Sequence, residues 1–257
     1  MEQSSNLKPV LEVKSLVKKY DDRQETQREK VIDNLDFAMY PGEFVCILGP
    51  SGCGKSTFLR CIGGFEKYEG EILVNGELVK KAGTDRIMVF QDFNQLLPWK
   101  TVEKNVQYPL KVQGIKEKEK LQAISDEYLD KVDLLAYKNF YPHQLSGGMK
   151  QRVAIARALA LKPHIILMDE PFASLDAMTR NRLQEELLQI HTKENITVIF
   201  ITHNIQEAIC LGTRTIVMSR QGNIKMDVKN TIPKPVTPAS ENYGKMWDMF
   251  HSALYEA

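Results

Sequence analysis

Residues 44–57 constrain the fold of this chain more than any other stretch. An apolar run at 44–48 leads into a glycine-rich loop, GPSGCGKST at 49–57, whose spacing is G-x-x-x-x-G-K-S. The apolar residues within 58–62 then have the spacing of one buried helix face. A strand, a glycine loop and a helix in this order are the context that a phosphate-binding loop requires. The stretch therefore predicts a nucleotide site.

Each residue type in this loop suits contact with phosphate. Gly49, Gly52 and Gly54 permit positive φ and let backbone amides approach an anion. Lys55 brings a positive charge toward the terminal phosphates, and the Ser56 hydroxyl can coordinate Mg²⁺. A glycine-rich turn that binds nothing is the alternative, but such a turn seldom follows an apolar strand. The predicted nucleotide-binding residues of the loop are Gly49, Pro50, Ser51, Gly52, Cys53, Gly54, Lys55, Ser56 and Thr57.

Length and charge narrow the class of protein. The 257 residues suit one large domain, or one domain that carries a subdomain. A net charge of +1 gives no overall attraction to nucleic acid or anionic lipid. The first residues lack the apolar core of a signal peptide, and no apolar run approaches the roughly 18 residues of a membrane span. We expect a cytosolic chain unless a partner holds it at a membrane.

The four cysteines form neither a C-x-x-C pair nor a zinc-binding pattern with histidine. Cys46 and Cys210 lie in apolar segments and are expected to be core thiols, as buried cysteines often are. Cys53 differs because it lies inside the glycine loop. We expect its thiol to be accessible at the ligand site.

The N-terminal third reads as a small antiparallel sheet. The residue pattern predicts an edge strand at 11–20, and period-2 alternation predicts a second strand at 31–39. A third strand at 71–74 precedes Asn75 and Gly76, a pair that favours a type I′ hairpin turn.

The middle of the chain has a helical pattern. Helices are predicted at 102–112, 118–132 and 147–161, and no strand pattern interrupts them. Pro109 is expected to kink or shorten the first helix. We interpret residues 92–163 as a helical insert.

Strands return after this insert, and a helix at 178–192 separates two of them. An alternation of strands and helices favours a parallel core. A last amphipathic segment spans 246–255. The predicted strands are 165–168, 197–201, 215–218 and 223–224.

Two adjacent carboxylates, Asp169 and Glu170, follow the strand at 165–168. Side chains alternate along a strand, so we expect the two carboxylates to point in opposite directions. Asp169 can then hold Mg²⁺, while Glu170 faces the water that attacks the γ-phosphate. An exposed acidic turn before Pro171 is the alternative.

A second helix start has features of an anion site. Ser146 is a good N-cap, and Gly147 and Gly148 expose backbone amides at the positive end of the helix. One nucleotide needs only one phosphate loop, so the second start raises the question of whose nucleotide it serves. A capped helix that binds no phosphate is the alternative.

Several motifs occur in the order typical of one family. They are Tyr20, GPSGCGKST (49–57), Gln91, LSGGMKQR (145–152), IILMDEP (165–171), Ser174-Leu175-Asp176 and His203. From about residue 10 to 225 the chain resembles the ATP-binding subunit of an ABC transporter. The resemblance implies an α/β fold of the P-loop NTPase (RecA-like) type. That fold has a parallel-sheet core, an N-terminal antiparallel β-subdomain and a helical subdomain. It also implies an ATP-binding domain at 8–230, with the helical subdomain at about 92–163, and a C-terminal extension at 231–257.

The resemblance also implies roles for individual residues. Tyr20 stacks on adenine, Gln91 senses Mg²⁺ and the attacking water, and His203 contacts the γ-phosphate. Two subunits pair head to tail, so Ser146, Gly147 and Gly148 of one close on the phosphate loop of the other. Asp176 lies in the loop that crosses between subunits. The implied catalytic residues are Glu170, His203, Gln91 and Lys55, and the implied metal-binding residues are Ser56, Gln91 and Asp169.

Two positions qualify this resemblance. Asn204 follows His203 where the family usually has an acidic residue, which leaves the neighbouring polar network open. Tyr20 could also be an ordinary aromatic residue at a strand end, because the polar segment that follows it is long for the family.

The segment after Gln91 resembles one branch of the family. Leu96-Leu97-Pro98-Trp99 is similar to the nitrate/sulfonate/taurine importers, although apolar residues here could equally be local packing. The resemblance implies an ATP-hydrolysing subunit that uses ATP and Mg²⁺ at the cytoplasmic face of a membrane. Its partners would be permease subunits, a second copy and, indirectly, a solute-binding protein, but no nucleic acid. The alternatives are a DNA-repair or chromosome-type ABC ATPase, or an ABC subunit for another solute class.

Overall fold

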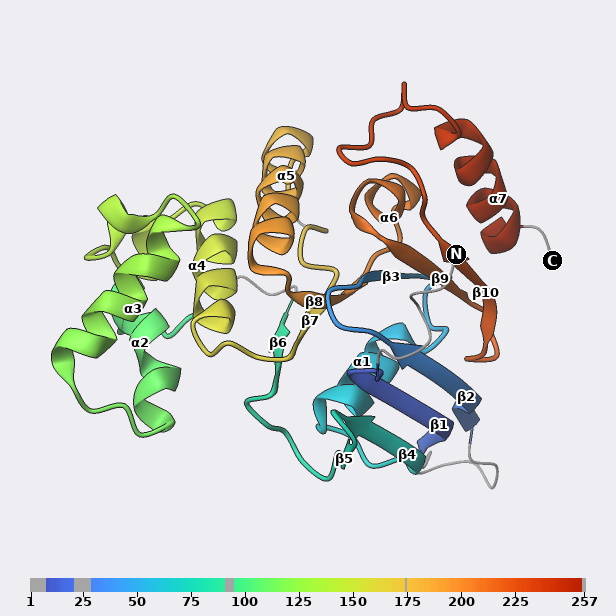
Figure 1. Ribbon diagram of the computed structural model, residues 1–257, viewed down its shortest axis with the longest axis horizontal. Coiled ribbons are helices and arrows are strands. Elements are labelled where there is room, and N and C mark those ends of the chain that lie inside the picture. Colours follow the sequence, from blue (N-terminus) through green and yellow to red (C-terminus); the bar gives the residue numbers. More distant parts are fainter. Residues whose placement is uncertain (1–7, 21–28, 91–94, 174, 256–257) are drawn as a thin grey trace. The chain divides into compact units, whose positions relative to one another are not determined.

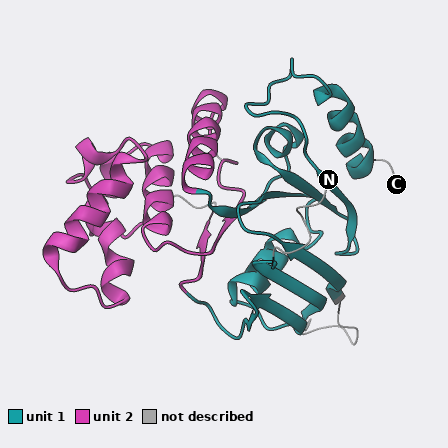
Figure 2. Cartoon of the chain, viewed as in Figure 1, with its two compact units in different colours: residues 1–83, 195–257 teal, residues 84–194 magenta. Residues whose placement is uncertain are grey.

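The computed structural model describes residues 8–20, 29–90, 95–173 and 175–255. It divides the chain into two compact units, coloured separately in Figure 2. The first unit comprises residues 1–83 and 195–257, and the second comprises residues 84–194.

The first unit contains two sheets and three helices among its described residues (Figure 1). Its elements are β1 (Leu11–Tyr20), β2 (Glu29–Met39), β3 (Phe44–Leu48), α1 (Lys55–Gly63), β4 (Glu69–Val74), β5 (Glu77–Leu78), β8 (Thr197–Ile201), α6 (Ile205–Leu211), β9 (Arg214–Met218), β10 (Ile224–Lys229) and α7 (Tyr243–Tyr255).

One sheet is antiparallel and has the strand order β2-β1-β4-β5. The strand predicted at 11–20 is present as β1, but the prediction that it lies at an edge is wrong, because β1 pairs with β2 on one side and β4 on the other. The predicted hairpin turn is confirmed by positive φ values of 50° at Asn75 and 82° at Gly76.

In the other sheet of this unit the order is β10-β9-β3-β8. Strand β3 pairs in parallel with both β8 and β9, which confirms the parallel core. All five β3 residues are buried, as expected for a strand that is covered on both faces. Strand β10 runs antiparallel to β9 and is longer than the two residues predicted.

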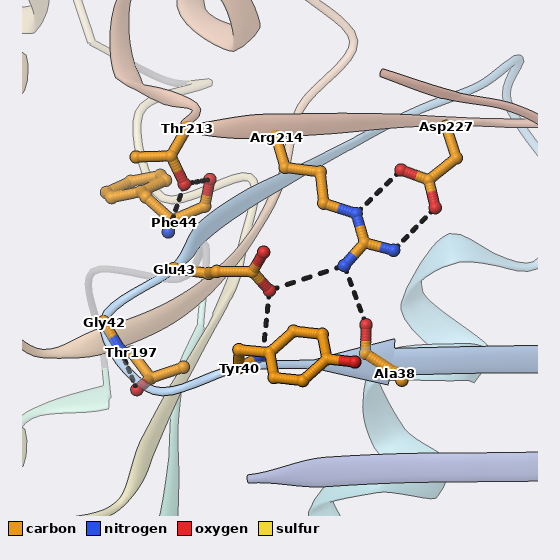
Figure 3. Close-up of polar contacts among 9 residues, drawn as sticks. All are labelled: Ala38, Tyr40, Gly42, Glu43, Phe44, Thr197, Thr213, Arg214 and Asp227. Carbon is orange, nitrogen blue, oxygen red and sulfur yellow. Dashed lines mark hydrogen bonds and ion pairs between the residues drawn. The ribbon is translucent and has the colours of Figure 1, made fainter. Parts of the chain in front are cut away.

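Arg214, the first residue of β9, ties these strands together (Figure 3). Its guanidinium donates two hydrogen bonds, of 2.7 and 2.6 Å, to the Asp227 carboxylate on β10. A third bond of 2.8 Å goes to the Ala38 carbonyl on β2, and Glu43 accepts a longer contact of 3.4 Å. The paired carboxylates raise the pKa of Arg214. One side chain thus joins the antiparallel sheet to the sheet that contains β3.

The same view shows how β3 begins. The Phe44 amide donates to the Thr213 hydroxyl at 2.9 Å, and that hydroxyl donates to the Phe44 carbonyl at 3.2 Å (Figure 3). The strand that leads into the phosphate loop is therefore fixed at its start by side chains as well as by its neighbouring strands.

The C-terminal residues pack on α6, and α7 lies against the same helix (Figure 1). Lys234 donates to the carbonyls of Ile209 and Cys210 at 3.0 and 2.6 Å. Asn230 donates to the carbonyls of Ile209 and Gly212 at 2.8 and 3.0 Å. These bonds satisfy carbonyl groups at the end of α6, which have no partner within the helix.

The second unit is largely helical. Its elements are β6 (Arg86–Val89), α2 (Val102–Val112), α3 (Lys118–Asp130), η2 (Leu135–Tyr137), η3 (Pro142–Gln144), α4 (Gly147–Leu159), β7 (Ile165–Asp169) and α5 (Ala177–Glu194). Strands β6 and β7 pair in parallel, and α2, α3 and α4 pack together. Helix α2 has the predicted bounds, so Pro109 does not shorten it.

In the part of the chain that the structure describes, no helix has both the length and the apolar character that a bilayer span requires.

Candidate functional site

The glycine loop joins β3 to α1, in the predicted order of strand, loop and helix. Gly54 has φ 97°, and a Cβ there would lie 2.8 Å from the Val31 carbonyl oxygen. A Cβ at Gly49 would lie 2.7 Å from the Cys53 sulfur. Glycine is needed at these positions because larger residues would meet neighbours or adopt a strained backbone.

Lys55 begins α1 and turns back over the loop. Its ammonium donates to the carbonyl oxygens of Gly49 at 2.8 Å and Pro50 at 3.0 Å. The side chain is buried, so the charge is held within the loop and away from bulk solvent. No side chain caps α1, whose N-cap is Gly54. A lysine charge beside backbone amides at a helix N-terminus forms an anion-binding arrangement.

Cys53 is not accessible, which contradicts our expectation. Its thiol is buried beneath the loop, with 2 % of the residue exposed, and burial raises its pKa despite the nearby Lys55 charge. The sequence places Cys53 in the loop, but the turn directs its side chain inward against Gly49. Only the backbone of Cys53 remains suited to contact a ligand.

Tyr20 and His203 also belong to the first unit. Tyr20 is the last residue of β1 and is 39 % exposed. His203 follows β8 and is exposed to solvent. Asn204 is the N-cap of α6, and its side-chain oxygen accepts from the amides of Gln206 and Glu207 at 2.8 and 3.3 Å. An amide side chain therefore performs the capping task at the position where the family usually has a carboxylate.

The adjacent carboxylates lie at the end of β7 in the second unit. Asp169 is the last residue of β7, one residue beyond the predicted end of the strand. Glu170 lies beyond the strand with φ 44°, in the left-handed region. The argument that strand alternation separates the two carboxylates is therefore wrong, because the backbone turns at Glu170. A non-glycine residue in this region is strained, and such strain is concentrated at functional sites.

Helix α4 starts as predicted. The Ser146 hydroxyl accepts a hydrogen bond from the Met149 amide at 3.3 Å, which identifies Ser146 as the N-cap. Gly148 has a further role that sequence reasoning missed, because a Cβ there would lie 2.8 Å from the Thr179 methyl carbon on α5. This glycine allows α4 and α5 to approach closely.

Asp176 precedes α5 and is exposed. Its carboxylate accepts from the Thr179 amide at 3.0 Å, and this bond lowers the pKa of Asp176. Asp176 therefore stays charged and caps the N-terminal end of α5.

The loop 97–101 presents Trp99 to solvent with 70 % of the residue exposed. Asn105 on α2 is fully buried and fixes this loop, a function that our sequence reasoning missed. Its side chain accepts from the Leu97 amide and donates to the carbonyls of Leu97, Lys100 and Thr101, at distances of 2.8 to 3.2 Å. The sequence feature that could have identified Asn105 is its position as a polar residue in an apolar helix face.

Gln91, the remaining predicted site residue, lies outside the described residues, so its predicted contact with metal and water stays a prediction. The two units divide the other predicted residues between them. Tyr20, the loop 49–57 and His203 belong to the first unit, and Ser146, Gly147, Gly148, Asp169, Glu170 and Asp176 belong to the second.

Comparisons with known sequences all identify the same family. The family model described as ABC transporter matches residues 32–173. An uncharacterised ABC transporter ATP-binding protein of Methanocaldococcus jannaschii is 47 % identical over 89 % of this chain and 85 % of its own length. The aliphatic sulfonates import ATP-binding protein SsuB of Bacillus cereus is 42 % identical, with 88 % and 89 % covered. The nitrate import ATP-binding protein NrtD of Synechocystis is 44 % identical, with 82 % and 80 % covered.

Solved structures agree with this assignment. A dimeric ATP-binding cassette in a post-hydrolysis state, bound to ADP and Pi, has a TM-score of 0.73 and 34 % identity. The match covers 85 % of this chain and 98 % of that one. The order of strand, phosphate loop and helix, the motifs and these matches lead to one conclusion: the chain belongs to the ABC transporter family, and its fold is that of a P-loop ATP-binding cassette.

Proposed function

We propose that this chain is the ATP-hydrolysing subunit of an importer that takes up a small anionic or polar solute of the nitrate, sulfonate or taurine type through a partner permease. The observation that carries the proposal is the phosphate loop between β3 and α1, where the buried Lys55 ammonium lies beside uncapped helix amides. Such a site binds the β- and γ-phosphates of a nucleotide. Family membership and the similarity to a cassette bound to ADP and Pi support ATP as that nucleotide.

The roles proposed for the site follow from the chemistry of each side chain. The exposed Tyr20 ring stacks on adenine, and residues 49–57 hold the phosphates. Glu170 orients the attacking water and polarises it, and His203 contacts the γ-phosphate.

Mg²⁺ fits the donor atoms of this chain. The Ser56 hydroxyl and the Asp169 carboxylate are oxygen ligands, which Mg²⁺ prefers, and Gln91 is the third proposed ligand. Within the described residues there is no cluster of three or more His, Cys, Asp or Glu side chains that could hold a metal alone. A site with few carboxylates is typical of Mg²⁺ that is also held by substrate phosphates. When bound, the ion neutralises charge that develops on the phosphates.

Replacement of the carboxylate tests the enzymatic proposal. Glu170→Gln should bind MgATP normally and release phosphate about 10²- to 10⁴-fold more slowly, because a positioned base is lost. Glu185→Gln, an exposed carboxylate on α5, is the matched control and should hydrolyse ATP at the wild-type rate. Near-normal phosphate release by Glu170→Gln would remove Glu170 from this role.

We further propose a head-to-tail dimer of two copies. The amides at Gly147 and Gly148, together with Ser146, would then serve the γ-phosphate of the partner, and Asp176 would lie in the loop that crosses between subunits. The dimeric state of related cassettes supports this assembly. Sedimentation of Glu170→Gln should show a dimer with MgATP and a monomer with MgADP. A monomer under both conditions, at concentrations where MgATP saturates the protein, would contradict the assembly.

The partner proposal concerns a membrane permease at the cytoplasmic face. Trp99 is 70 % exposed on a loop that Asn105 holds in place, so it is available as an interface anchor, whereas Leu96 in the same stretch is buried core. Trp99→Ala should therefore reduce co-purification with the permease and leave the melting temperature unchanged. Tyr255→Ala, a similarly exposed aromatic residue on α7, is the control. Normal recovery of the complex by Trp99→Ala would end the docking proposal.

The solute class rests on the relatives named for sulfonate and nitrate import. We assign the ATP-binding domain to 8–230, with a helical subdomain at about 92–163, and the C-terminal extension to 231–257. Uptake of labelled taurine, alkanesulfonate and nitrate by cells that carry or lack this chain tests the solute class. A solute-binding protein would deliver the solute to the permease.

A further inference from the structure

The positively charged ammonium of Lys18 lies against one face of the Tyr20 ring. The Lys18 ammonium lies 4.4 Å from the centroid of the ring, within the range of a cation–π interaction. Lys18 is buried, with 7 % of the residue exposed, whereas Tyr20 is 39 % exposed. Since the lysine covers one ring face, the exposure of Tyr20 comes from its other face and its edge.

Lys18 is itself held in place by two bonds. Its ammonium donates to the Glu66 carboxylate and to the Lys67 carbonyl, both at 2.9 Å. These bonds leave little freedom to a side chain that is usually mobile. The hydrogen bond from Lys18 is the largest cause that lowers the pKa of Glu66, and a bond from the Tyr20 hydroxyl contributes to it. The Glu66 carboxylate is therefore charged at neutral pH.

The turn that supplies Glu66 is fixed to the helix of the phosphate loop. It follows α1 directly, where Gly64 adopts φ 73° and the Phe65 amide donates to the Arg60 carbonyl at 3.0 Å. A Cβ at Gly64 would overlap the Lys81 carbonyl, so the turn packs closely on the chain beyond β5. Glu66 thus has a defined position relative to α1, and the phosphate loop lies at the opposite end of that helix.

We propose that Lys18, held by Glu66, is a positioning residue for the nucleotide base. It supports one face of the Tyr20 ring, so that the ring presents its other face to a purine in a preset orientation. A preorganised ring loses less freedom when the base stacks on it, which increases affinity. This inference rests on the proposed function, because it requires Tyr20 to bind the base.

A double-mutant cycle tests the inference. MgADP affinity is measured by titration calorimetry for Lys18→Met, Tyr20→Leu and the double variant, with pyrophosphate as a probe of the phosphate loop alone. Lys18→Met should weaken MgADP binding about fivefold, since cation–π support is lost, and leave pyrophosphate binding unchanged. In the Tyr20→Leu background the lysine replacement should have no further effect, because Lys18 acts through the ring.

Lys19→Met is the matched control. Lys19 is the neighbouring residue on β1, and it forms an ion pair of 3.3 Å with the exposed Glu69. This variant should bind MgADP like the wild type. If Lys18→Met does not fold, as judged by circular dichroism, the double replacement Lys18→Met/Glu66→Met removes both charges together and should show the same loss.

The outcomes distinguish failure of the positioning role of Lys18 from failure of the proposed function. Unchanged MgADP affinity in Lys18→Met, or an equal loss in the presence and absence of the Tyr20 ring, would overturn the positioning role. If Tyr20→Leu binds MgADP normally while Lys55→Ala does not, the phosphate site stands and this inference falls. If the wild type binds neither MgADP nor pyrophosphate, the proposed function itself fails.

Discussion

Helices α1 and α4 both begin at a glycine-containing sequence, but their N-terminal ends are built differently. Helix α1 has Gly54 as its N-cap, a residue without a side chain that could accept from the first amides. Helix α4 is capped by Ser146, whose hydroxyl accepts from the Met149 amide. The first helix start leaves its amides to an anion and adds the Lys55 charge, whereas the second already satisfies one amide internally. The two helix starts therefore differ in whether an N-cap side chain already occupies one of the first amides.

The largest expected effect is a loss of MgATP affinity when the lysine at the start of α1 is replaced, but not when the lysine at the start of α4 is replaced. Lys55→Ala should weaken MgATP binding to the isolated chain by about 10- to 100-fold, because charge-assisted hydrogen bonds to phosphate are lost. Lys150→Ala, in the first turn of α4, should leave that affinity unchanged. Fluorescence titration with a labelled ATP analogue measures both variants. Equal losses would mean that α1 and α4 contribute alike, and the comparison would break down.

Glycine replacement should affect stability at α1 more than at α4. Gly54→Ala should lower the free energy of unfolding by about 1–3 kcal/mol, since φ 97° and the Val31 carbonyl both oppose a Cβ. Gly148→Ala should change it by less than about 1 kcal/mol, because helix propensity offsets the contact with the Thr179 methyl group. Thermal unfolding followed by circular dichroism compares them. A larger loss in Gly148→Ala would show that the packing of α4 on α5 cannot relax.

Removal of the Ser146 cap of α4 should have a smaller effect on stability. Ser146→Ala should cost about 1 kcal/mol of stability, because the Met149 amide loses its side-chain partner. Ser146→Asp should retain most of the stability, since a carboxylate also caps a helix well. The melting temperatures of both variants measure this difference. No change in Ser146→Ala would mean that solvent replaces the hydroxyl fully.

The smallest expected effect is on the rate at which the thiol beneath the phosphate loop is modified. Cys53 is buried, so maleimide should modify it as slowly as the core residue Cys46, and more slowly than the half-buried Cys210. Mass spectrometry of the native and the denatured protein at pH 8 gives the three rates. Rapid modification of native Cys53 would indicate that the loop at α1 opens readily.

Regular elements were predictable from the sequence where the local pattern decided the structure. The bounds of α2 and β8 were predicted correctly, because helix and strand periodicity are local properties. The position of β1 in its sheet was not, since alternation shows that a strand forms but not which strands pair with it. The extent of β10 was missed although its residues, IKMDVK, alternate strictly between apolar and charged side chains.

At the site, residue identity was more predictable than orientation. The position of the phosphate loop between strand and helix and the Ser146 cap were predicted correctly, and the end of β7 was predicted to within one residue. Cys53 was placed correctly along the chain but its thiol is buried rather than accessible, because the turn of the loop directs the side chain inward. Asn105 was missed, since its value comes from four hydrogen bonds to a loop that sequence spacing does not specify.

The contacts at the end of α6 bear on how this chain can be handled and altered. Lys234 and Asn230 bind the last carbonyls of the helix that begins just after His203. Burial lowers the pKa of Lys234 to about 8, which reflects how far this side chain is withdrawn from water. A chain shortened before Asn230 would expose those carbonyls and the face of α6 that α7 covers. Residues 230–255 therefore stabilise the end of α6, and a fusion partner or protease site is better placed after Tyr255 than before Asn230.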